Sequence, residues 1–244
     1  MITLISDIDG TILGDSQGLF ELNGFLNENR DKFFIVYATG RDITEMHRGL
    51  FTEGLIMPDA AILSTGSEIY TVENGIFTPD TEWENTISVS WNKKAAEESA
   101  EQTGCMITQG KSEKFKVSYF IEPSRADEIR RMLECRFKEN NVRAKIIISH
   151  GKYLDIIPEN CDKGKAGEFL IKKLNKPAQS TIVAGDSEND VDLFESFSQG
   201  IVVGNAHSGL RLAANNRDFY MAGAHCGYGV LEGLKYYMQR FQTV

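Results

Sequence analysis

The sequence predicts an α/β protein in which a parallel sheet is interrupted by a smaller α+β unit. Short apolar runs alternate with amphipathic helical segments at the start of the chain, which favours parallel strands joined by helices. The alternation stops in the middle of the chain and resumes after Pro158. We therefore expect one domain at residues 1–79 and 159–244, and an inserted domain at residues 80–158.

The first domain begins with three expected strands and two expected helices. The strands are the apolar runs Ile2–Ser6, Phe33–Tyr37 and Ala60–Leu63. Apolar side chains recur at helical spacing around Leu19–Asn29 and Asp42–Glu53. This order of strand and helix indicates parallel strands with right-handed crossovers.

The middle of the chain changes to patterns of short strands with tight connections. Asn74-Gly75 lies between two strand-like runs in Glu68–Thr78, which predicts a hairpin. Helices are expected at about Trp91–Thr103 and from Pro123 to about Glu139. Strands are expected near Cys105–Thr108, Phe115–Ile121, Arg143–Ile148 and Tyr153–Ile157. This set indicates an antiparallel sheet with helices.

The last part of the chain returns to the first pattern. Helices are expected at Gly164–Leu174, Asp190–Phe197 and Tyr228–Phe241, and strands at Ser180–Ala184 and Gly200–Val203. Together with the first segment, these elements predict a Rossmann-like sheet built from both ends of the chain.

The composition excludes some partners. The 244 residues include 26 Lys and Arg and 35 Asp and Glu, a net charge of −9. Nucleic acids and anionic membranes favour clustered cations, so neither is expected as the main partner. A small anionic substrate needs only a few local cations and stays open.

Location and assembly follow from other features of the sequence. Every apolar run is far shorter than the roughly 20 residues of a membrane span, and the N-terminus MITLISDIDG lacks the basic start of a signal peptide. The four cysteines form no CxxC pair, which favours free thiols in a reducing compartment. We expect a cytoplasmic protein, and we expect it to be a monomer.

Two carboxylates follow the first expected strand. Asp7 and Asp9 would repel each other at the carboxyl end of a buried strand unless a cation lies nearby. Ligands of open parallel sheets bind at this edge. The alternative is a simple acidic turn, because Asp-Gly pairs are common in turns.

A second acidic cluster follows another apolar strand. Asp186 and Asp190 flank Ser187, Glu188 and Asn189. A helix start capped by Ser187 would explain Glu188, but not an aspartate against the strand end. Carboxylates gathered from both clusters would form an oxygen-only site, which suits Mg²⁺ better than Zn²⁺.

Two further segments are weaker signals when taken alone. Thr39-Gly40-Arg41 follows the second strand and could hold a phosphate at a helix start, or be a plain helix start. Lys163 opens the helix where the first pattern resumes, and a lysine there is most often solvated. The four histidines show no paired spacing and are expected to be surface or capping residues rather than zinc ligands.

In this order, these segments resemble the four motifs of the haloacid-dehalogenase (HAD) superfamily. The matching segments are DIDGT at 7–11, ATGR at 38–41, Lys163 and GDSENDVDLF at 185–194. The inserted domain resembles the large α/β cap of the Cof-like sugar-phosphatase branch. The resemblance implies a HAD core with an α+β cap.

The resemblance also implies roles for individual residues. Asp7 would be the nucleophile, Asp9 the general acid and base, and Lys163 the group that neutralises charge. Thr39, Gly40 and Asn189 would bind phosphate. Mg²⁺ would be held by Asp7, Asp186 and the backbone carbonyl of Asp9, and Asp190 would orient Lys163 or a metal-bound water.

Three segments resemble the sucrose-phosphate phosphatases in particular: GSEIY at 66–70, FKVSY at 115–119 and SHGKYLDIIP at 149–158. They imply a sugar pocket under the cap. Its expected residues are Arg41, Ser67, Glu68, Lys116, Tyr119, Lys152 and Asp155. Alternating polar residues on a strand more often face solvent, and that alternative stays open.

The expected activity is Mg²⁺-dependent hydrolysis of a sugar phosphate, sucrose 6-phosphate before others, through an aspartyl-phosphate. Mannosylfructose-phosphate phosphatases and broad-specificity Cof-like phosphatases share the motifs. Gly10 and His150 depart from the pattern and leave the sugar open. A phosphomutase or a sugar-phosphate-binding protein without turnover are further alternatives.

Overall fold

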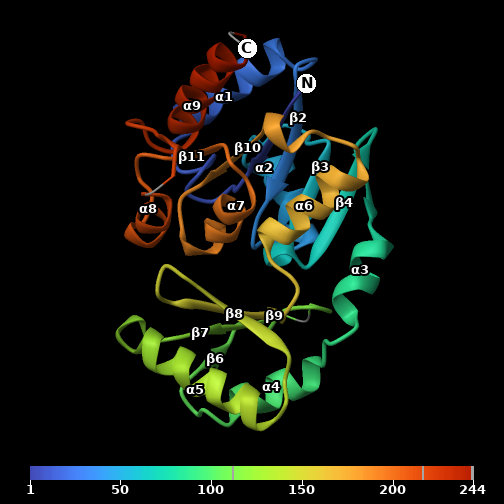
Figure 1. The fold of residues 1–244 in the computed structure, drawn as a ribbon, viewed down its shortest axis with the longest axis vertical. Coiled ribbons are helices and arrows are strands. Elements are labelled where there is room, and N and C mark those ends of the chain that lie inside the picture. Colours follow the sequence, from blue (N-terminus) through green and yellow to red (C-terminus); the bar gives the residue numbers. More distant parts are fainter. Residues whose placement is uncertain (112, 216, 243–244) are drawn as a thin grey trace.

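Two β-sheets organise the part of the chain that the structure describes (Figure 1). The structure is a computed structural model, and it describes residues 1–111, 113–215 and 217–242. The larger sheet contains strands from both ends of the chain, and the smaller sheet contains strands from the middle. The N-terminus and the end of α9 lie on the same side of the larger sheet, far from the smaller one.

The larger sheet has the order β12-β11-β10-β1-β2-β3-β4-β5. Pairing is parallel from β12 to β3 and antiparallel from β3 to β5. Its strands are β1 (Ile2–Ser6), β2 (Phe33–Ala38), β3 (Ala60–Leu63), β4 (Glu68–Glu73), β5 (Ile76–Pro79), β10 (Thr181–Gly185), β11 (Gly200–Val202) and β12 (Tyr220–Met221). Strands β3 and β10 are buried throughout, as expected for central strands with helices on both faces.

The helices of this part connect and cover the strands. They are α1 (Ser16–Glu28), α2 (Ile43–Thr52), α6 (Lys163–Lys173), α7 (Val191–Ser196), α8 (Ser208–Ala214) and α9 (Cys226–Gln242), with the single turns η1 (Ser64–Gly66), η3 (Ala178–Ser180) and η4 (Glu188–Asp190). Helix α1 packs against α9, and α6 packs against α7. Asp42 and Glu45 form a capping box that fixes the start of α2 after β2.

The smaller sheet is antiparallel and has the order β6-β7-β9-β8. Its strands are β6 (Ile107–Thr108), β7 (Val117–Phe120), β8 (Ala144–Ser149) and β9 (Tyr153–Pro158), with α4 (Lys93–Glu101), η2 (Pro123–Arg125) and α5 (Ala126–Glu139) beside them. Helix α3 (Thr81–Ser88) comes before these elements in the chain and packs on the core of the larger sheet. Helices α4 and α5 lie on the face away from the larger sheet (Figure 1). Ile129, Leu133, Leu154 and Ile156 are buried in a core that is separate from the core of the larger sheet.

The structure confirms the α/β class, with a parallel main sheet and a second, antiparallel sheet. Helices α3 and α8 and strand β12 were not expected from the sequence. Helix α3 has eight residues and buries only Trp83 and Ile87, too few for a clear helical period. The division into domains at residues 80 and 158 stays a prediction. Within the described residues, no helix combines the length and the apolar composition of a membrane span.

Candidate active site

The candidate site lies at the carboxyl ends of neighbouring parallel strands. Asp7 directly follows β1, and Asp186 directly follows β10. These strands pair with Ile5 opposite Val183, so the two aspartates leave the sheet side by side. Thr39 follows β2 on the other side of β1. The parallel register thus brings together residues from the two ends of the chain.

Lys163 lies at the centre of the acidic cluster. Its Nζ is 2.7 Å from Asp7 Oδ1 and 2.7 Å from Asp190 Oδ1, and the side chain is fully buried. The start of α6 reaches this depth because Gly66 allows close approach: a Cβ there would collide with the backbone of Asp162. The φ of Gly66 is +98°, which also favours glycine. In the sequence, Lys163 alone was only a weak sign of a functional site, but the structure places it in contact with two aspartates.

Asp190 connects this lysine to the loop after β10. Its Oδ2 accepts hydrogen bonds from the backbone N–H groups of Asp186 at 3.0 Å and Ser187 at 3.2 Å. One carboxylate therefore fixes both the lysine and the loop that carries Asp186. Asp190 therefore has a structural role beyond favouring the start of a helix.

Burial dominates the electrostatics of the cluster. It raises the pKa of Asp7, an effect that Lys163 partly offsets. Burial, followed by the nearby Asp190, raises the pKa of Asp186 to about 6. Burial lowers the pKa of Lys163, but Asp190 and Asp7 more than compensate, so that pKa is raised. The lysine is thus held charged, while carboxylates around it would be stabilised by a further cation.

Three carboxylates have the donor set of a hard divalent cation. Asp7, Asp186 and Asp190 each offer an oxygen, and these oxygens lie within 4.8 Å of one another. Thr11 Oγ1 donates to Asp186 Oδ1 at 3.2 Å and holds that carboxylate. A Cβ on Gly10 would collide with the Asp186 carboxylate, so glycine is needed at this position. The oxygen-only set fits Mg²⁺, as the sequence predicts.

Asp9 lies apart from these three carboxylates. Its side chain is 58% exposed and accepts two hydrogen bonds from Arg41, at 2.6 and 2.8 Å. Arg41 also contacts Glu53 at 2.6 Å. Any contribution of Asp9 to a cation site therefore falls to its backbone carbonyl, while its side chain is held by arginine.

A cavity of about 710 Å³ lies above the cluster, between the two sheets. Both sheets contribute side chains to its walls. Its lining residues are Asp7, Asp9, Thr39, Gly40, Arg41, Glu45, Arg48, Gln109, Lys111, Lys116, Ser149, His150, Lys152, Tyr153, Asp155, Ser187 and Asn189. Lys163, Asp186 and Asp190 lie beneath this lining. Lys163 contacts Asp7, and Asp190 accepts from the backbone of Ser187, so these buried residues fix the lining from below.

Direct contacts join the two sheets around the cavity. Lys116 Nζ donates to the carbonyl oxygen of Gly40 at 2.8 Å. Thr65 Oγ1 donates to Asp155 Oδ2 at 2.9 Å. Lys111 forms an ion pair with Glu45 at 2.8 Å. The structure therefore has the smaller sheet closed over the strand ends.

Three expected substrate residues lie outside the lining. Ser67 is fully buried, Glu68 accepts a hydrogen bond from Tyr70 at 2.9 Å, and Tyr119 packs in the core behind the smaller sheet. Tyr119 shares a strand face with Val117, because alternate residues of a strand point the same way. Four lining residues, Glu45, Arg48, Gln109 and Lys111, belong to none of the motifs identified in the sequence. Tyr153 and Ser187 also line the cavity, although no role in substrate binding was expected for them from the sequence.

Comparison with known proteins identifies the family. The sequence profile of the sucrose-6F-phosphate phosphohydrolase family matches residues 1–238. The chain belongs to this family. Membership confirms the HAD resemblance that the four motifs carried, including the resemblance to the sucrose-phosphate phosphatases.

Individual members of the sucrose-6F-phosphate phosphohydrolase family are similar over nearly the whole chain. Sucrose-phosphatase 2 of Nicotiana tabacum is 31% identical over 96% of this chain, which spans 58% of the tobacco protein. The structure of the sucrose-phosphatase from Synechocystis sp. PCC6803 in complex with sucrose and phosphate is 30% identical. It superimposes with a TM-score of 0.87 over 96% of this chain and 97% of its own.

Two further similarities are weaker. Mannosylfructose-phosphate phosphatase of Agrobacterium fabrum is 26% identical, over 96% of both chains. The haloacid dehalogenase-like hydrolase yhjK of Bacillus subtilis is 21% identical, with a TM-score of 0.68 over 96% of this chain and 91% of its own. The latter shows the HAD fold alone.

Proposed function

We propose that this protein is a Mg²⁺-dependent phosphatase that hydrolyses sucrose 6-phosphate. The observation that carries the proposal is the buried Asp7–Lys163–Asp190 set beneath a cavity whose opposite wall comes from the smaller sheet. The floor supplies a nucleophile and a fixed positive charge. The opposite wall supplies polar side chains that a sugar requires. Family membership and the likeness to the Synechocystis enzyme support this substrate.

The reaction would proceed in two steps. An Asp7 oxygen attacks phosphorus, the bond between phosphorus and the sugar oxygen breaks, and Asp9 gives a proton to that oxygen. Asp9 then takes a proton from water, which attacks phosphorus and releases phosphate from Asp7. Before the first step, Arg41 must release the Asp9 carboxylate or move with it, because the ion pair occupies both carboxylate oxygens.

Thr39, Gly40 and Asn189 would hold the phosphoryl oxygens. Each lies in the lining close to Asp7 in the fold, at the end of β2 or after β10. Lys163 would balance the charge that develops between Asp7 and the phosphate. Positioning and charge then lower the barrier of the loose transition state.

Asp7, Asp186 and the backbone carbonyl of Asp9 would hold Mg²⁺, with Asp190 fixing the loop beneath. The three carboxylates and the raised pKa of Asp186 support a divalent cation here. When bound, the ion would neutralise phosphate charge and orient the phosphoryl group for attack. Gly10 supports a cation at this position too, because the absence of a Cβ lets the turn after Asp9 lie directly against the Asp186 carboxylate.

Sugar recognition would depend on the wall from the smaller sheet. Lys152, Tyr153, Asp155 and Ser149 line it from the β8–β9 hairpin. Hydroxyl, ammonium and carboxylate groups can donate to and accept from sugar hydroxyls. The cavity volume of about 710 Å³ falls within the range of small-molecule sites.

The monomeric state and the cytoplasmic location are also proposals. All four cysteines are free thiols, and Cys161 and Cys226 are buried, which supports a reducing compartment. Size-exclusion chromatography with light scattering would test the monomer.

Phosphate release from a substrate panel tests the proposed function. The panel contains sucrose 6-phosphate, mannosylfructose phosphate, glucose 6-phosphate, fructose 6-phosphate and p-nitrophenyl phosphate, each with Mg²⁺ and with EDTA. We expect a metal-dependent preference for sucrose 6-phosphate. A preference for mannosylfructose phosphate, or equal rates with all five esters, would overturn sucrose 6-phosphate as the substrate. Binding without phosphate release would indicate a mutase or a binding protein.

A further inference from the structure

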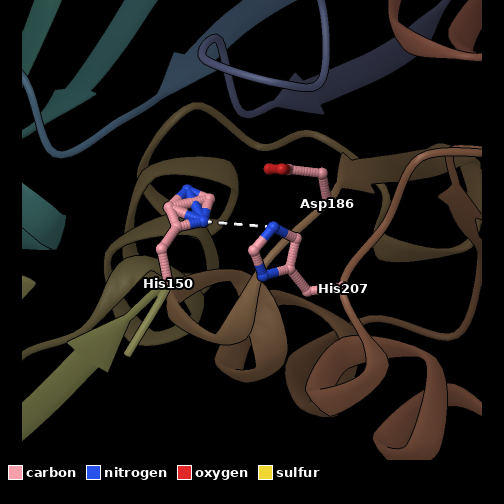
Figure 2. Close-up of side chains that lie close together, drawn as sticks. All are labelled: His150, Asp186 and His207. Atoms are coloured by element: carbon pink, nitrogen blue, oxygen red, sulfur yellow. Dashed lines mark hydrogen bonds between the residues drawn. The ribbon is translucent and has the colours of Figure 1, made fainter. Parts of the chain in front are cut away.

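Two histidines from different sheets meet beside Asp186 (Figure 2). His150 lies in the turn between β8 and β9, and His207 directly precedes α8. His150 Nδ1 is 3.3 Å from His207 Nε2. One ligand atom from each of the three residues lies within 4.8 Å of the other two. The histidines are 57 positions apart in the sequence, so their spacing gives no metal motif.

We propose that His150, His207 and Asp186 form a second cation site, which takes a transition-metal ion such as Zn²⁺ and ties the β8–β9 turn to the larger sheet. Two imidazoles and one carboxylate are the donor set of such ions. This differs from the expectation that the histidines are only surface or capping residues.

The distance between the two nitrogens supports this site. Two Zn–N bonds of about 2.05 Å at a tetrahedral angle place their nitrogens roughly 3.3 Å apart, the separation found here. Without an ion, the same separation corresponds to a hydrogen bond between the two rings, which a metal would replace (Figure 2). The pair is thus spaced for a shared ion.

Glu188 provides a second, independent observation. Its Oε2 lies 3.9 Å from His207 Nδ1. The same oxygen accepts a hydrogen bond from the backbone N–H of His150 at 3.4 Å. At 3.9 Å the Glu188 carboxylate is beyond hydrogen-bond distance of His207 Nδ1, so its contribution is a negative charge that favours a cation beside the two rings.

Asp186 belongs to both sets of ligand atoms, and a carboxylate has one oxygen for each of two ions. The all-oxygen set would prefer Mg²⁺, and the set with two imidazoles would prefer the softer ion.

A bound ion would link the two walls of the cavity. His150 lines the cavity, and so do Lys152 of the same turn and Tyr153 at the start of β9. The ion would hold this turn against the larger sheet and slow the exchange of substrate and product. Only this effect on turnover rests on the proposed function, because metal binding itself needs no substrate.

Calorimetric titration of the protein with Zn²⁺, under saturating Mg²⁺, tests the site. His150→Asn suits a residue with φ of +51°, since asparagine tolerates that conformation. His207→Gln is the second variant, and His47→Gln on α2 is the matched control. We expect the Zn²⁺ affinity of each site variant to fall by about tenfold or more, with the control unchanged. Equal Zn²⁺ binding in all four proteins would overturn the site.

Two further measurements separate the parts of the proposal. Bound Co²⁺ should give the strong visible absorption of a tetrahedral ion in the wild type and lose it in His150→Asn; the same spectrum in both would contradict the ligand set. Zn²⁺ should slow phosphate release by the wild type more than by His150→Asn. Equal inhibition would overturn the tether. A protein that binds Zn²⁺ but releases no phosphate would count against the proposed function alone.

Discussion

Lys163 forms a buried ion pair with Asp7, with Nζ 2.7 Å from Oδ1. The pair connects the two ends of the chain, because Asp7 follows the first strand and Lys163 opens α6. Asp190 contacts the same ammonium group from the other side. One buried cation thus contacts two carboxylates, and it partly offsets the rise that burial causes in the pKa of Asp7. Fold stability and the proposed chemistry depend on the same residue.

Replacing Lys163 with methionine should therefore cost both stability and activity. Asp7 and Asp190 would lose their buried partner, which typically destabilises a protein by about 3–5 kcal/mol. Urea unfolding at neutral pH measures this change. Lys165→Met, two residues further along α6 and half exposed, is the control and should cost little. Equal loss in both variants would contradict the central position of Lys163.

Asp7→Asn should abolish turnover and leave the fold intact. Asparagine has nearly the same shape but cannot form the acyl phosphate, so we expect a loss of about 10⁴-fold or more in kcat. The melting temperature should not fall, because burial makes an ionised Asp7 costly. Asp15→Asn is the matched control, since asparagine also caps α1. Substantial turnover by Asp7→Asn would remove Asp7 as the nucleophile.

The raised pKa of Asp186 predicts how pH and Mg²⁺ act together. Its pKa is about 6 in the folded protein against an ordinary 3.8. A carboxyl group with a raised pKa stabilises the folded state most below its unfolded pKa, and this stabilisation is lost as the pH rises through about 6. Without divalent cations, melting temperature should fall across this window.

Mg²⁺ should reverse this loss, because it takes the place of the proton. We expect the rise in melting temperature on adding Mg²⁺ to be larger at about pH 7.5 than at about pH 5. NaCl at matched ionic strength controls for screening. An equal Mg²⁺ effect at both pH values would argue against binding at Asp186.

Two lysines of the smaller sheet should separate sugar recognition from closure. Lys152 is exposed on the β8–β9 turn, so Lys152→Ala should raise KM for sucrose 6-phosphate by about tenfold with little change for p-nitrophenyl phosphate. Lys116 is buried and donates to the carbonyl of Gly40, so Lys116→Ala should impair both substrates. Identical profiles for the two variants would contradict this division.

The sequence was most informative where signals are local. The ends of β1, β2 and β10 are marked by short apolar runs followed at once by polar residues, and parallel pairing then brings those residues together. Asp7 and Asp186 could therefore be expected at the same edge of the sheet without knowledge of the strand order. The roles of these residues came from the family resemblance, and they stay proposals.

The wall of the cavity was harder to predict. Lys116 directly precedes β7 and Tyr119 lies on it three positions later, so alternation places them on opposite faces, and Tyr119 packs in the core. That alternation was available in the sequence. By contrast, Glu45 and Arg48 reach the cavity only through the placement of α2 against the smaller sheet. The meeting of His150 with His207 likewise depends on how the two sheets face each other.

Trapping of the phosphoryl group on the protein tests the central claim most directly. Sucrose 6-phosphate carrying radiolabelled phosphorus is mixed with the enzyme and Mg²⁺, and the reaction is quenched in acid within milliseconds. We predict label on wild-type protein and none in Asp7→Asn. In Asp9→Asn, both the appearance and the loss of label should be slower, because this variant can neither protonate the leaving oxygen nor activate water. Turnover by the wild type with no label on protein in either wild type or Asp9→Asn, or label that persists in Asp7→Asn, would contradict an aspartyl-phosphate at Asp7.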